Sequence, residues 1–110
     1  KRALEILKDM QEVRDGDFVF PGGKPRRPLS NMALLTTLRR MKRTDITVHG
    51  FRSTFRDWAA EQTNFSREVA EMALAHAVGN KVEAAYRRGD MFDKRVKLME
   101  AWAEHCDAKR

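Results

Sequence analysis

Apolar side chains recur three and four residues apart through most of this sequence, which is the spacing of residues on one face of an α-helix. The first stripe covers residues 2–13, and the others follow a long polar loop. The stripes are Ala3, Ile6, Leu7, Met10 and Val13; Leu34, Leu35, Leu38 and Met41; Phe51, Phe55, Trp58, Ala59 and Gln62; Val69, Met72 and Ala73; Val82, Ala85 and Tyr86; and Phe92, Val96, Met99, Trp102 and Ala103. The sequence therefore predicts a mainly α protein with five or six helices, the last of which buries Phe92, Met99 and Trp102.

Loop-forming residues separate these helices. All three prolines fall within residues 21–28, which must be a loop because proline lacks the amide donor of a helix interior. Residues 18–20 before it form at most a short strand. Ser30 or Asn31 is expected to cap the second helix and Ser66 the fourth, since side-chain oxygens of these types accept hydrogen bonds from the first turn.

Length and composition narrow the class of protein. With 110 residues, the chain is expected to be one domain, residues 1–110, or a piece of one. Its hydrophobic fraction of 42% is too high for a disordered chain, and no apolar run reaches the ~18 residues that a membrane span needs. The opening residues do not resemble a signal peptide. The single cysteine, Cys106, excludes an internal disulfide and favours a reducing compartment. The chain opens within a predicted helix and without methionine, so we expect a fragment of a longer protein.

The positive charge is concentrated in one quarter of the chain. The net charge is +6, and the segment 18–44 holds no acidic residue. Its seven basic residues are Lys24, Arg26, Arg27, Arg39, Arg40, Lys42 and Arg43. The remainder has 15 basic and 16 acidic residues and a net charge of −1. Such a segment suits the phosphate backbone of a nucleic acid, and a solvated face that keeps the protein soluble explains it equally well at this point.

Two histidines, an arginine and the only tyrosine are candidates for chemistry. His49 and Arg52 are three residues apart, so on a helix they point to one side. An arginine fork fits two oxygens of a phosphate, and a histidine donates a hydrogen bond or moves a proton near neutral pH. His76 and Tyr86 lie ten residues apart, and each continues an apolar stripe. Taken singly, each of these residues has a plainer interpretation. His49 and Arg52 are then a solvated pair, and His76 and Tyr86 are residues packed at the edge of the core.

Three short strings taken together resemble the tyrosine recombinases, also called phage integrases. The strings are His49-Gly50-Phe51-Arg52, Leu74-Ala75-His76 and Ala84-Ala85-Tyr86-Arg87-Arg88, in the order and spacing of the family. From about Phe18 to Ala103, the sequence is similar to prophage and genomic-island integrases. The resemblance implies the C-terminal part of a catalytic domain that is mixed but mostly helical. It implies no cofactor and no metal, and no cluster of histidine, cysteine and aspartate here has metal-ligand spacing.

The resemblance also implies roles for four residues. Tyr86 falls where the family has its nucleophile, Arg52 on the second catalytic arginine, and His49 on the residue three before it. His76 falls on the histidine of the third motif, and its ten-residue step to Tyr86 is usual in the prophage subgroup. Another catalytic arginine, an acidic residue and a lysine are expected to precede this sequence, as is the N-terminal DNA-binding domain. We therefore expect the parent protein to be an enzyme and this fragment alone to be inactive.

The activity implied by the resemblance is site-specific DNA recombination, that is, integration or excision. A tyrosine attacks a phosphodiester, positive groups stabilise the charge on the phosphate oxygens, and a 3′-phosphotyrosine links protein to DNA until a 5′-hydroxyl rejoins the strand. The implied partners are double-stranded attachment-site DNA, contacted by the seven basic residues, and further protomers on that DNA, in the bacterial cytoplasm at the nucleoid and without a membrane.

Three rival interpretations remain at this point. They are a type IB topoisomerase, which uses similar groups, a non-catalytic helical DNA-binding module in which Tyr86 is a core residue, and a protein-interaction bundle without nucleic acid. Placement discriminates between them, since the enzyme requires His49, Arg52 and His76 to converge on one basic cleft.

Overall fold

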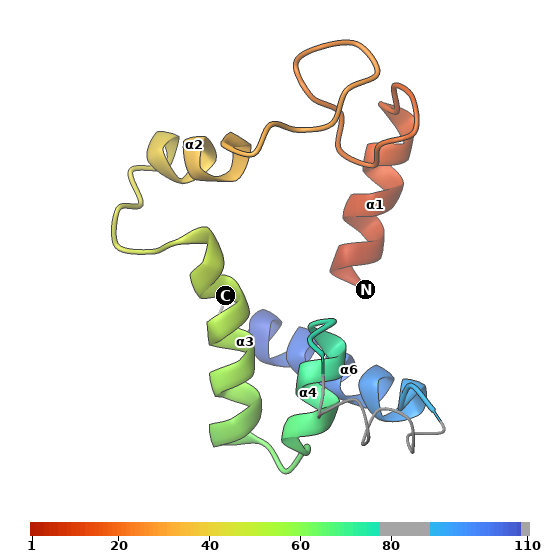
Figure 1. Ribbon diagram of the computed structural model, residues 1–110, viewed down its shortest axis with the longest axis vertical. Helices are drawn as coiled ribbons and strands as arrows, with labels where there is room; N and C mark the ends of the chain where they lie inside the picture. Colours follow the sequence, from red (N-terminus) through yellow and green to blue (C-terminus); the bar gives the residue numbers. More distant parts are fainter. Residues whose placement is uncertain (78–88, 109–110) are drawn as a thin grey trace. The chain divides into compact units, whose positions relative to one another are not determined.

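The computed structural model describes residues 1–77 and 89–108 (Figure 1). These residues form five helices and no strand. The helices are α1 (Arg2–Glu12), α2 (Ala33–Arg40), α3 (Val48–Gln62), α4 (Arg67–Ala73) and α6 (Phe92–Ala108). The predicted mainly α fold is therefore confirmed. The helix expected around Val82, Ala85 and Tyr86 lies outside the described residues.

The chain divides into two compact units, Lys1–Val48 and His49–Arg110. The first unit carries α1 and α2, and the second carries α4, α6 and all but the first residue of α3. The expectation of one domain over residues 1–110 stays a prediction.

In the first unit, α1 is an amphipathic helix without a buried side chain. Leu7 and Met10 of its apolar stripe line a surface pocket of about 370 Å³ together with Phe18 and Val19. The segment 18–20, expected to be at most a short strand, is thus an irregular stretch beside α1 that contributes apolar side chains to the same surface.

The predicted loop of residues 21–28 is closed by an isolated antiparallel bridge between its first and last residues. Only glycine fits at Gly22, because a Cβ there would lie 2.2 Å from the Pro28 oxygen. The Asp15 carboxylate accepts a hydrogen bond from the Arg26 amide at 3.2 Å. This bond ties the loop to the chain that follows α1.

Helix α2 begins later than its predicted cap. Neither Ser30 nor Asn31 caps it with a side chain, and Met32 occupies the N-cap position instead. The backbone carbonyl of Ser30 accepts from the Ala33 amide at 3.1 Å. The cap prediction is wrong because a turn of backbone satisfies this amide before the helix starts. The one buried residue of α2 is Leu38.

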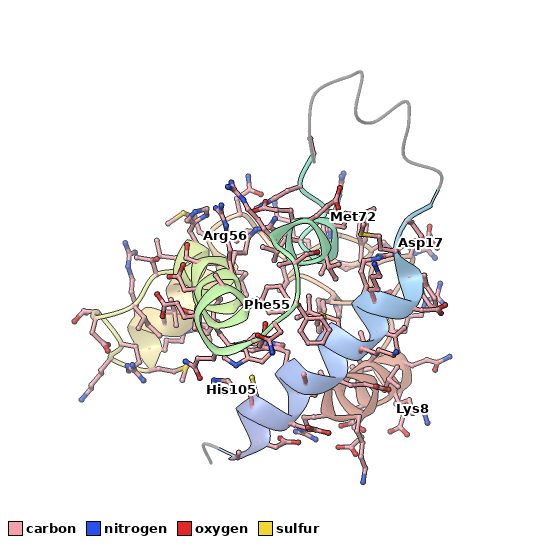
Figure 2. The ribbon with its side chains drawn as sticks, turned by 90° about the horizontal axis from the view of Figure 1, so that it is seen from below. Lys8, Asp17, Phe55, Arg56, Met72 and His105 are labelled. Carbon is pink, nitrogen blue, oxygen red and sulfur yellow. The ribbon has the colours of Figure 1, made fainter. Side chains whose placement is uncertain are left out.

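The second unit has the larger core, which is formed by residues of α3, α4 and α6. Figure 1 shows how these three helices are arranged. Its buried residues are Phe55, Trp58, Ala59, Val69, Ala70 and Leu98. Figure 2 shows Phe55 between these helices, and its ring meets Trp102 edge-on with 5.4 Å between centroids. Ser66 caps α4 as predicted, since its Oγ accepts from the Val69 amide at 3.4 Å.

Helix α6 turns a different face to this core than the sequence predicts. Trp102 packs against the core but is half-buried instead of buried as predicted, and Phe92 and Met99 are 61% and 45% exposed. The prediction that Phe92 and Met99 are buried is wrong because α6 carries a second stripe with helical spacing, and that stripe packs. Its members are Leu98, Ala101, Trp102 and His105.

Candidate functional site at the end of helix α4

Helix α4 ends in a tight turn that brings His76 back over its last residues. Leu74 caps the helix, and Ala75 adopts the left-handed conformation with a φ of 56°. The Ala75 amide donates to the Met72 carbonyl at 3.0 Å. The His76 amide donates to the Glu71 carbonyl at 2.9 Å. These two bonds make a Schellman motif, in which glycine is the usual left-handed residue.

Arg52 reaches this turn from helix α3. Its Nη2 donates a hydrogen bond to the Leu74 carbonyl at 2.6 Å, between residues 22 apart in the sequence. The last carbonyls of a helix have no partner within the helix, so this donor satisfies one of them. Because His76 follows Leu74 by two residues, Arg52 and His76 meet the same short turn of backbone. A guanidinium has five N–H donors, and this bond uses one of them.

Glu71 connects His76 to helix α3. Its Oε2 lies 2.6 Å from Nδ1 of His76. Its Oε1 lies 2.8 Å from Nε of Arg56 and 3.8 Å from Nε of Arg67. Figure 2 shows Arg56 on the side of α3 toward α4. The Glu71 side chain is only 12% exposed. Oε1 accepts no hydrogen bond from the described residues, so at 2.8 Å Arg56 pairs with it through charge and without an aligned N–H.

The Glu71 carboxylate is ionised at neutral pH. The hydrogen bond with His76 is the largest cause that lowers the pKa of Glu71. The positive charges of Arg56, His76 and Arg67 lower this pKa further, and partial burial opposes them. A negative charge is therefore held where Arg56 and Arg67 meet α4 beside His76.

Of the four predicted catalytic residues, Arg52 and His76 lie at the turn after α4. His49 is exposed and lies one turn before Arg52 on α3, so both point to one side of that helix. Arg56 follows Arg52 by one more turn on the same side. Tyr86 lies outside the described residues. The roles of all four predicted residues stay predictions.

A surface pocket of about 480 Å³ adjoins the cluster where α3 leads into α4. Arg56 and Arg67 line it together with Phe65 and Ser66, but neither Arg52 nor His76 does. The convergence of the two histidines and Arg52 on one basic cleft thus stays a prediction.

The basic residues of segment 18–44 are all exposed in the first unit. Two of them, Arg39 and Arg40, occupy the last turn of α2, where the negative end of the helix dipole favours cations. Arg43 differs from the others because it pairs with Asp45 through two hydrogen bonds of 2.8 and 2.7 Å. These bonds lower the pKa of Asp45 to about 2. The remaining basic residues are Lys24, Arg26, Arg27 and Lys42.

Sequence reasoning missed Glu71 and Arg56. The available signal was spacing, since Glu71 precedes His76 by five residues and Arg56 follows Arg52 by four. That signal becomes specific only once the turn at Leu74 is known.

Neither a metal-ligand cluster nor a membrane span is found in the described chain. Among residues 1–77 and 89–108, no group of three or more histidine, cysteine, aspartate or glutamate side chains is placed to hold a metal ion. In the same part of the chain, no helix has the length and apolar character needed to span a membrane.

Comparison with known proteins shows that this chain is similar to phage and prophage integrases. It is 35% identical to prophage integrase IntA of Escherichia coli (strain K12) over 93% of its length and 34% identical to prophage integrase IntZ of the same strain over 98%. Over the full length of this chain, it is 28% identical to the integrase of Enterobacteria phage P4. These alignments cover 25%, 27% and 26% of the relatives, so the chain spans about a quarter of their length. No protein-family model and no solved structure matches it. The agreement in sequence along nearly the entire chain, together with its helical fold, places this protein in the phage and prophage integrase family.

Proposed function

We propose that this chain is part of the active domain of a tyrosine-type site-specific DNA recombinase. Membership of the integrase family supports DNA integration in general. The observation that carries the finer proposal is the turn after α4, where Arg52 is bonded to the Leu74 carbonyl and His76 follows two residues later. A guanidinium and an imidazole beside each other are the donors that a phosphodiester needs.

The proposed chemistry begins with Tyr86. Its hydroxyl oxygen attacks a DNA phosphorus atom and loses its proton, the bond to the 5′ oxygen breaks, and that oxygen gains a proton. The product is a 3′-phosphotyrosine and a free 5′-hydroxyl. A free tyrosine has a pKa near 10, so it needs a base or a positive field to react at neutral pH. Arg52, His49 and His76 supply positive hydrogen-bond donors to the phosphate oxygens in this proposal.

DNA binding is assigned to the exposed basic residues of the first unit. Six of the seven have no acidic partner among the ion pairs of the described chain, whereas Arg43 pairs with Asp45. Cations on a surface bind phosphates with little dependence on sequence. The partners in this proposal are double-stranded attachment-site DNA and further protomers assembled on it.

Trapping the covalent intermediate tests the proposal. The full-length integrase that contains this chain is incubated with a nicked duplex that releases a short 5′-hydroxyl fragment on cleavage. Wild type should form a protein–DNA adduct, and peptide mapping should place the phosphate on Tyr86. Tyr86→Phe removes one oxygen and should abolish the adduct. Arg52→Ala should nearly abolish it, and His49→Ala and His76→Ala should slow it.

The same experiment can contradict the proposal. An adduct that forms at the wild-type rate in Tyr86→Phe would make the tyrosine structural. DNA binding without any adduct in the wild type would favour the non-catalytic DNA-binding module.

A further inference from the structure

We propose that Glu71 is a positioning residue for His76, holding the imidazole by Nδ1 so that Nε2 is presented to the DNA phosphate. This inference rests on the proposed function and adds to it a residue that reaches the reaction only through His76. It depends on the turn after α4, the Glu71 carboxylate and the cations that surround them.

The geometry fixes His76 at two points. Its main-chain amide donates to the Glu71 carbonyl at 2.9 Å, and its Nδ1 lies 2.6 Å from Oε2 of the same residue. The Glu71 side chain is 12% exposed, whereas that of His76 is 38% exposed. The carboxylate is thus the enclosed partner of the pair, and the ring remains partly exposed to an incoming ligand.

The chemistry of the pair decides which nitrogen faces Glu71. An ionised carboxylate can only accept hydrogen bonds, so Nδ1 must carry a proton in this contact. Nε2 is then the atom left for a substrate oxygen, and when the ring is protonated Nε2 donates as well. A hydrogen bond that orients the second nitrogen is a common way in which proteins set the tautomer of a functional histidine.

The charges around His76 make this carboxylate important. Arg52 and Arg56 approach from α3, and Arg67 lies one turn before Glu71 on α4. Helix α6 packs on the other side of α4 through apolar residues, and the ion pairs of the described residues connect none of its charged groups to Glu71 or His76. Glu71 therefore places a negative charge among these cations, in contact with the imidazole.

Glu71 also fixes His76 relative to the helix that carries Arg52. Its Oε1 meets Arg56 at 2.8 Å, one helical turn beyond Arg52. The two phosphate donors are thereby held from both sides: Arg52 through the Leu74 carbonyl and His76 through the Glu71 carboxylate. The Leu74 carbonyl and the Glu71 carboxylate, which hold these donors, would not themselves touch DNA.

The test measures how fast the full-length integrase forms the Tyr86–DNA adduct over a range of pH. Glu71→Gln keeps the size of the side chain and removes its charge. Adduct formation should slow on the order of tenfold near neutral pH. This loss is smaller than the whole rate contribution of a well-placed proton donor, because the imidazole itself remains. The rate of the variant should begin to fall at a lower pH than that of wild type, because the protonated ring loses the negative charge beside it. Glu100→Gln, on the exposed surface of α6, is the matched control and should change nothing.

A double-mutant cycle separates positioning from a structural role. In a His76→Asn background, Glu71→Gln should cause no further loss, because Glu71 acts through the ring. Arg56→Gln removes the ion pair between Glu71 and Arg56 and keeps the contact of Glu71 with His76, so it should not lower the pH at which the rate begins to fall. Thermal unfolding of each variant identifies any change that comes from misfolding.

Three outcomes would overturn the inference. They are an unchanged rate and pH profile in Glu71→Gln, an additive loss in the His76→Asn background, and the same pH shift in Arg56→Gln. A wild type that forms no Tyr86 adduct would instead overturn the proposed function itself, and with it any catalytic part for Glu71.

Discussion

Ala75 occupies a backbone conformation that residues with a Cβ rarely adopt. Its φ of 56° lies in the left-handed region, which costs an alanine about 1–2 kcal/mol relative to the right-handed helix. The cost is tolerated because the turn satisfies amides at both Ala75 and His76. Strained backbone of this kind is often kept where it positions functional groups, and here it lies between the anchor of Arg52 and the pair of His76 with Glu71.

Ala75→Gly should therefore stabilise the chain by about 0.5–1 kcal/mol, since glycine adopts this conformation without a steric cost. Urea unfolding measures the change. Ala60→Gly, at an exposed position within α3, is the matched control and should destabilise by about 1 kcal/mol. A loss of stability in Ala75→Gly would mean that the alanine methyl makes a contact worth more than the backbone strain.

The sequence identified part of the candidate site. Spacing and the resemblance to family motifs pointed to Arg52 and His76, which both lie at the turn after α4. Glu71 and Arg56 were not identified, because a glutamate and an arginine on amphipathic helices are ordinary surface residues until packing brings them together. Their contact depends on how α4 packs beside α3, and the contact of Glu71 with His76 depends on the turn that follows Ala73.

At the scale of elements, helix positions follow the sequence more closely than helix faces do. The predicted stripe of residues 2–13 corresponds to α1, and the cap at Ser66 is found as predicted. In α6, the apolar positions suit two overlapping faces that share Trp102. Periodicity cannot choose between such faces, because the choice depends on which one fits the surface of α3 and α4.

Two adjacent residues of α6 should respond very differently to truncation. Leu98→Ala removes a side chain with 0% exposure and should cost about 2–5 kcal/mol of the free energy of unfolding. Met99→Ala removes one that is 45% exposed and should change that free energy by no more than about 0.5 kcal/mol. Chemical denaturation of both variants measures the difference. Equal losses would show that Met99 is covered in solution, as the first of the two stripes predicts.

At the scale of the whole molecule, charge and core are divided between the two units. The first unit holds all seven basic residues of segment 18–44 and one buried residue, Leu38, among the residues that the structure describes. The second unit holds the apolar cluster and the candidate site. This division predicts that affinity for DNA and chemistry on DNA respond to different sets of mutations.

Neutralising the charges at the end of α2 and in the turn after it should weaken DNA binding at any sequence. In Arg39→Gln/Arg40→Gln/Lys42→Gln, the slope of log affinity against log salt should become shallower by about 0.9 for each phosphate that the protein no longer neutralises. Adding Arg43→Gln should change the slope little, because Arg43 is paired with Asp45. Fluorescence anisotropy with two unrelated duplexes measures both effects. Lys94→Gln/Lys97→Gln on α6 is the control, and an equal change there would mean that binding follows net charge instead of the basic segment.

The bond between Arg52 and Leu74 has a consequence for how this protein can vary. The acceptor is a main-chain oxygen, and every amino acid has one. Exchanging the side chain at position 74 therefore leaves the acceptor itself in place. Adding or removing one residue between Ala73 and His76 would displace both the acceptor and the imidazole, whatever residues remained. Integrases should accordingly be free to differ in residue identity at this position and be intolerant of any change in its length.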